Sequence, residues 1–205
     1  RRQAAGLRHP QAAVYELTAA NSHPVVRALA EGNACMTRAL PAVVARIDRA
    51  TTELEQINSD ARELEQRLAR SRQRLDVGGL SRAIGLLLVE ESRSLPQVSQ
   101  HRAQVNARST TLAEVGLAHM RIQEQRRELR SLDARVELVM TEVTDEMADE
   151  AELARMRGEV RLLLLDRRDL LLQAENTYSG YLQVLGDLDV AQRRLLESAG
   201  GYREF

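Results

Sequence analysis

A stripe of mostly apolar residues, spaced alternately three and four positions apart, runs along one part of the chain and stops just before a double glycine. Its members are Ile47, Ala50, Leu54, Ile57, Ala61, Leu64, Leu68, Ser71 and Leu75. This is the a/d spacing of a coiled coil, in which one narrow face of a helix packs against a partner helix. Because alanine and serine are among its members, we expect the partner to approach closely. We call this stripe the seam.

The double glycine offers a turn through which the same chain can supply that partner. A glycine at the end of a helix readily adopts the left-handed backbone conformation that terminates it. A short, very apolar segment follows and ends at a proline, after which charged residues resume. We therefore predict the main hairpin turn near residues 77–81. The positions that define this turn and the restart are Gly78, Gly79, Leu80, Leu95 and Pro96.

Helical patterns continue on both sides of this turn. We predict a short helix over 11–20, a helix start at Pro24, and further helices over 97–140 and 148–198. Pro41 predicts a kink or a break near residues 37–41, because a proline inside a helix removes a hydrogen bond and clashes with the preceding turn. Acidic residues after Thr141 suit the first turn of the last helix. A second turn is therefore predicted near residues 141–147.

These patterns predict an all-α fold: elongated antiparallel helical hairpins, or a bundle, with coiled-coil seams. The chain has 205 residues, of which 43% are hydrophobic, 29% are charged and only 2% are aromatic. A composition so poor in aromatic residues favours long helices packed along narrow faces. Forty residues of helix span roughly 60 Å. We expect residues 1–23 to form a lead-in segment and residues 24–205 to form the elongated helical domain.

No pattern in the sequence predicts a catalytic, cofactor-binding or metal-binding site, and we expect that the protein is not an enzyme. The four histidines lack the helical i, i+4 spacing of metal ligands; they are His9, His23, His101 and His119. Cys35 is the single cysteine, so no intrachain disulfide can form, and its side chain could be buried as a small hydrophobe.

The charge pattern argues against nucleic-acid binding. The net charge is −1, the isoelectric point is about 6.5, and the two signs alternate along the chain. A nucleic-acid-binding domain would gather its basic residues on one face. Every basic residue is arginine and none is lysine. This could reflect phosphate or carboxylate recognition, or the codon bias of a GC-rich genome, which is the interpretation that we favour.

Three stretches, in this order, resemble the periplasmic helical region of the large mechanosensitive channels of the MscS superfamily, of the MscK (KefA) type. They are RLDVGGLSRAIGLLLVEESRSLP at 74–96, RSTTLAEVGLAHMRIQEQRREL at 108–129 and YLQVLGDLDVAQRRLLESAGGYREF at 181–205. The resemblance covers about residues 24–205. The sequence departs from the family pattern at Pro41 and at residues 116–120 (GLAHM), where the family carries an aromatic residue.

The resemblance implies a homoheptameric channel in the bacterial inner membrane that opens under bilayer tension and releases ions and small solutes on osmotic downshock. It implies that this region lies in the periplasm and contributes assembly or collar architecture. The pore and the membrane contacts would belong to segments outside this chain, and no cofactor is implied. The alternative is a free-standing helical coiled-coil scaffold or interaction protein.

Overall fold

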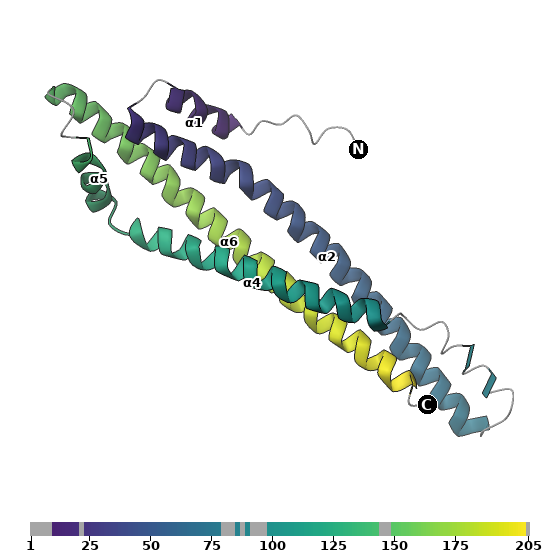
Figure 1. Cartoon of the computed structure of the whole chain (residues 1–205). Helices are drawn as coiled ribbons and strands as arrows, with labels where there is room; N and C mark the ends of the chain where they lie inside the picture. Colours follow the sequence, from purple (N-terminus) through teal and green to yellow (C-terminus); the bar gives the residue numbers. More distant parts are fainter. Residues whose placement is uncertain are drawn as a thin grey trace. The chain divides into compact units, whose positions relative to one another are not determined.

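The computed structural model describes residues 10–20, 23–78, 85–86, 89–90, 98–143 and 149–203. Within these ranges the chain is helical and contains no strand, so the predicted all-α class is confirmed. The helices are α1 (Pro10–Ala20), α2 (Pro24–Gly78), α4 (Val98–Glu128), α5 (Leu132–Thr141) and α6 (Glu150–Arg203) (Figure 1). None of the helices in the described ranges combines the length and the apolar character needed to cross a membrane.

The chain forms two compact units. Unit 1 contains residues Arg1–Ala45 and Gly116–Gly180, and unit 2 contains residues Arg46–Val115 and Tyr181–Phe205. The helices α2, α4 and α6 each contribute residues to both units, whereas α1 and α5 belong to unit 1. The predicted seam, residues 47–75, therefore lies wholly within unit 2.

Of the kink or break expected near residues 37–41, the break is wrong, because α2 continues through Pro41 from Pro24 to Gly78, and the kink stays a prediction. The pyrrolidine ring lies on an exposed face of the helix. On the opposite face, Leu40 and Val43 are 8% and 7% exposed. Burial of such side chains contributes roughly 1.5–3 kcal/mol each. Their combined contribution is as large as the roughly 3 kcal/mol that an internal proline costs.

The single helix predicted over 97–140 is also wrong, since α4 ends at Glu128 and α5 begins at Leu132. Ser131 occupies the N-cap of α5 in an extended conformation, and Asp133 follows in the first turn. Arg126 and Arg127 lie in the last turn of α4, where cations complement the helix dipole. The interruption leaves Leu129 in a turn, with its side chain in the core of unit 1.

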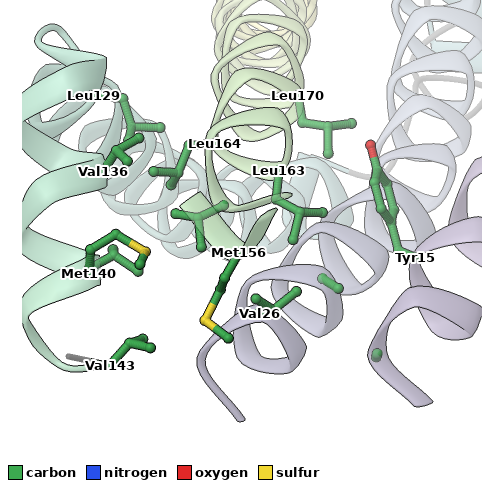
Figure 2. Packing of buried hydrophobic residues seen from close by; sticks show 14 of the residues in the cluster. Tyr15, Val26, Leu129, Val136, Met140, Val143, Met156, Leu163, Leu164 and Leu170 are labelled. Carbon is green, nitrogen blue, oxygen red and sulfur yellow. The ribbon is translucent and has the colours of Figure 1, made fainter. Parts of the chain in front are cut away.

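The core of unit 1 is mainly apolar and is built chiefly from α1, α2, α5 and α6, with the partly buried Ile122 of α4 packed against it. It contains Tyr15 of α1, Val26 of α2, Leu129, Val136 of α5 and a run of α6 residues from Met156 to Leu171. Figure 2 shows that α6 directs side chains to both of its sides. Leu164 points toward Leu129 and Val136, whereas Leu163 points toward Val26. Leu171 and Val160 are completely buried. Helix α6 is thus the central element of this core.

The seam is the face that α2 buries in unit 2. Five of its members are buried, namely Ala50, Ile57, Ala61, Leu64 and Ser71, and the other four are half-buried. The corresponding face of α6 presents Tyr181, Leu185, Leu188, Ala191 and Leu195, all buried. The bidentate ion pair of Arg194 with Glu65 also joins α6 to α2 in this unit.

The start of α6 follows ordinary capping rules. Asp149 precedes the helix, and its Oδ1 accepts a hydrogen bond from the backbone N–H of Ala151 at 3.0 Å. Glu150 and Glu152 lie in the first turn, where negative charge is favoured. The predicted start at residue 148 is therefore accurate to two residues, which is the usual error of such an assignment.

Candidate functional site

Of the five positions that the sequence singled out at the turn, the described residues include Gly78, the last residue of α2. Gly79, Leu80, Leu95 and Pro96 lie outside the described residues. The predicted turns near 77–81 and 141–147 follow the ends of α2 and α5, at Gly78 and Thr141. The hairpin turns themselves stay predictions.

The described residues that were considered as possible ligands are not brought together, and His9 lies outside the described residues. Cys35 is exposed, so the suggestion that it could be buried is wrong. His23 precedes the first residue of α2 and His119 lies on α4, and both are partly buried. Among the described residues, no group of three or more histidine, cysteine, aspartate or glutamate side chains could hold a metal ion.

The most unusual buried group is Arg108 of α4, in unit 2. Its side chain is only 7% exposed. Its guanidinium donates to Oε1 of Gln192 on α6 at 2.5 Å and to Oε1 of Glu53 on α2 at 3.0 Å. Burying a cation is costly unless it is paired and hydrogen-bonded, and both conditions are met here. Arg108 therefore links α4 to both α2 and α6 within unit 2.

Gln192 extends this arrangement and is itself completely buried. Its Nε2 donates to Oε1 of Gln104, one turn before Arg108 on α4, at 2.7 Å. Its amide group thus accepts from one α4 side chain and donates to another. We call Glu53, Gln104, Arg108 and Gln192 the polar layer. A connected polar layer fixes the relative register of its helices, because a shift would leave buried polar groups unpaired.

An open groove of about 530 Å³ lies beside the polar layer, within unit 2. Its base is formed by the buried α6 side chains Tyr181, Leu185 and Leu188. Residues of α2 and α4 line the two sides. Three of the lining residues are arginines, at positions 46, 49 and 108, and one is an acid, Glu53. The groove therefore combines an apolar base with a surplus of positive charge.

The aromatic ring in this groove helps to position one of the arginines. The guanidinium carbon of Arg46 lies 5.2 Å from the centre of the Tyr181 ring. This distance is within the range of a cation–π interaction, which orients the cation over the ring face. Further along unit 2, Nε and a terminal nitrogen of Arg194 contact both oxygens of Glu65 at 2.7 and 2.8 Å. That hydrogen bonding lowers the pKa of Glu65 below its ordinary value.

Unit 1 has a smaller groove, of about 220 Å³, lined by Arg167. Burial lowers the pKa of this arginine from its ordinary value. The guanidinium donates to Oε1 of Gln125 at 3.3 Å and lies 3.2 Å from the position that a Cβ on Gly32 would occupy. Gly32 therefore leaves space for Arg167 across the surface of α2. This groove presents less space and less charge than the groove of unit 2.

Sequence reasoning missed both the polar layer and the groove. Arg108 is a polar residue that occurs among many others on a charged helix, and nothing in its local spacing distinguishes it. One weak signal existed, because Gln192 falls four residues after Leu188 and three before Leu195. This spacing puts a glutamine on the buried face of α6. A polar residue at a seam position requires a polar partner on another helix.

Comparison of the chain with models of known protein families, with curated proteins and with solved structures finds no match.

Proposed function

We propose that this chain is an extramembrane helical region of a tension-gated mechanosensitive channel of the MscS superfamily. In this proposal it lies on the periplasmic side of the bacterial inner membrane. It contributes assembly or collar architecture to a homo-oligomer, which the family resemblance implies is a heptamer. The pore that releases ions and small solutes belongs to other segments of the channel.

The observation that carries the proposal is the packing of three long helices around shared narrow faces. Helices α2 and α6 contain 55 and 54 residues, and each supplies buried side chains at three- and four-residue spacing to both units. Two of the stretches that resemble the channel family also meet directly, since Arg108 of the second contacts Gln192 of the third. This supports a role in which the helices are structural elements.

The first test is the coding sequence downstream of Phe205. We expect several apolar segments of about 20 residues each, the length needed to cross a bilayer as helices, with the last one rich in glycine and alanine. A stop codon, or continuation without such segments, would overturn the channel proposal. The chain would then be a free-standing helical scaffold.

The second test uses the full-length protein in bacteria that lack their own tension-gated channels. We expect that deleting residues 24–205 will lower the yield of assembled oligomer or shift the gating tension measured by patch clamp. The matched control replaces two exposed arginines of α2, Arg62→Gln and Arg70→Gln, and should behave as the wild type. Normal assembly together with normal gating after the deletion would refute an architectural role.

A further inference from the structure

The groove of unit 2 has the features of a ligand site, and this inference does not rest on the proposed channel function. Its volume of about 530 Å³ falls within the range of about 300–1,000 Å³ that is typical of small-molecule sites. Such sites combine a mostly apolar lining with a few polar groups that fix the orientation of the ligand. Here Leu185 and Leu188 supply apolar surface, and arginines supply charge.

The charges in the groove favour an anion. Three guanidinium groups face one carboxylate, that of Glu53, and this carboxylate is hydrogen-bonded to Arg108 at 3.0 Å. Arg108 is therefore committed to the polar layer. Arg46 and Arg49 are exposed on the same side of α2, three residues apart. A concave surface with a surplus of one charge attracts ions of the opposite sign.

We propose that this groove binds an amphiphilic organic anion, with a carboxylate or phosphate group held by Arg46 and Arg49 and an apolar body lying over Leu185 and Leu188. The planar guanidinium fork matches the geometry of carboxylate and phosphate oxygens. The ring of Tyr181 holds Arg46 over the base of the groove, at 5.2 Å. Part of the binding site is thus already ordered without a ligand.

The apolar base and the arginines of the groove together argue against ligands that are only charged or only apolar. An inorganic anion would leave the apolar base in contact with water and would gain nothing from it. A neutral apolar molecule would cover the base and remove water from nearby arginines without balancing their positive charge, which costs free energy. A molecule that carries both parts satisfies both surfaces. The groove should therefore bind a molecule that carries both an anionic group and an apolar body more tightly than a molecule that carries only one of them.

The test measures binding of octyl phosphate to the 205-residue chain by isothermal titration calorimetry, below the concentration at which the probe forms micelles. Inorganic phosphate and octanol serve as the two half-ligands. We expect saturable binding of one octyl phosphate per chain, and at least tenfold weaker binding of each half-ligand. Absence of saturable octyl phosphate binding, or equal binding of inorganic phosphate, would overturn the proposal.

Paired variants test the location. The double variant Arg46→Gln with Arg49→Gln, which we call the rim variant, removes two positive charges from the groove and leaves the residues of the polar layer unchanged. We expect the affinity for octyl phosphate to fall roughly tenfold or more, as loss of charge-assisted hydrogen bonds predicts. Arg62→Gln with Arg70→Gln removes the same charge from exposed positions of α2 outside the groove lining. Equal affinities of the two paired variants would refute this location, and unchanged circular dichroism of both will show that they fold.

The anion could come from a membrane lipid or from a free molecule. Sedimentation with phosphatidylglycerol vesicles, compared with phosphatidylcholine vesicles, separates these sources. Binding to the anionic vesicles that requires Arg46 and Arg49 would support the site and identify a lipid head group. Octyl phosphate binding without vesicle binding would support the site and identify a free molecule. Vesicle binding that is equally strong in the rim variant, without octyl phosphate binding, would overturn the proposal.

Discussion

The two units differ in the kinds of side chain that their helices bury against one another. Unit 1 has a core of large apolar side chains such as Leu164 and Leu171, beside which the buried Asn33 donates a hydrogen bond to the backbone carbonyl of Leu163. Unit 2 has a narrower buried face with small residues such as Ala61, and it contains the polar layer around Arg108. Burial of apolar surface stabilises the fold without requiring particular pairs of residues to meet. The hydrogen bonds of a polar layer are directional and require specific residues to meet. We therefore expect unit 1 to depend on side-chain volume and unit 2 on register.

The largest expected effect is in the apolar core. Leu163→Ala should lower the free energy of unfolding by about 3–5 kcal/mol, because Leu163 lies in the core of unit 1 outside the linings of both grooves and its removal leaves a cavity. Leu188→Ala removes the same atoms in unit 2 but should cost only about 2–3 kcal/mol, because Leu188 borders the open groove. Urea denaturation followed by circular dichroism measures both values. Equal losses in the free energy of unfolding would mean that the groove beside Leu188 does not lower the cost of the substitution and that the two cores are equally enclosed.

A smaller effect is expected in the polar layer. Arg108→Ala should destabilise the protein by about 1–3 kcal/mol, because the buried Oε1 of Gln192 loses the hydrogen bond that it accepts from the guanidinium. Glu53, whose side chain is 46% exposed, can regain water. The double variant Arg108→Met with Gln192→Leu should recover part of this loss, because it replaces the buried polar pair with apolar groups. Arg70→Ala is the exposed control.

That double variant also tests the role of the layer in register. We expect hydrogen exchange in α4 near residue 108 to become faster even where stability is recovered, because the directional contacts are gone. If the double variant were both as stable and as well protected as the wild type, the polar layer would not be needed for register.

Ionisation of Tyr15 should make the stability of unit 1 depend on pH in the alkaline range. Burial, together with the nearby Asp166 carboxylate, raises the pKa of this tyrosine from 10.0 to about 12. The folded protein therefore holds the phenol proton more tightly than the unfolded chain does. Its contribution to stability is full below pH 10 and is lost as pH rises from 10 to about 12. The total should be at most about 3 kcal/mol.

The measurement is the free energy of unfolding across that pH range in the wild type and in Tyr15→Phe. We expect the variant to lose less stability between pH 10 and 12. The other tyrosines titrate in both proteins and serve as an internal control. Parallel curves would show that Tyr15 is not buried beside Asp166 in solution.

The smallest effect is expected at the surface of unit 1. A hydrogen bond from Arg126 lowers the pKa of Glu175 below its ordinary value of 4.5. The contribution to stability is therefore present above about pH 4.5 and is lost as pH falls through the lowered pKa. Because this pair is at the surface, the effect should not exceed about 1 kcal/mol. Arg126→Gln should flatten the acid limb of the stability curve, and high salt should do the same in the wild type.

Much of the helical framework could be predicted because it depends on local rules. Asp149 and Glu150 mark the start of α6, and Gly78 marks the end of α2. The two errors at Pro41 and near Leu129 arise where packing overrides those rules. A proline with an exposed ring is tolerated inside a helix whose other face is buried. A helix is interrupted where a turn directs Leu129 into a core.

The sequence by itself determined the helical class and the faces that the helices bury, because a three- and four-residue spacing can hide one face only if the chain is helical. Only the tertiary structure decided which buried polar residues meet. Arg108 and Gln192 are 84 residues apart in the chain, and their contact depends on the register of α4 against α6. The groove has the same origin, since its arginines and its apolar base come from different helices. Register between helices is a property of packing, and no local pattern encodes it.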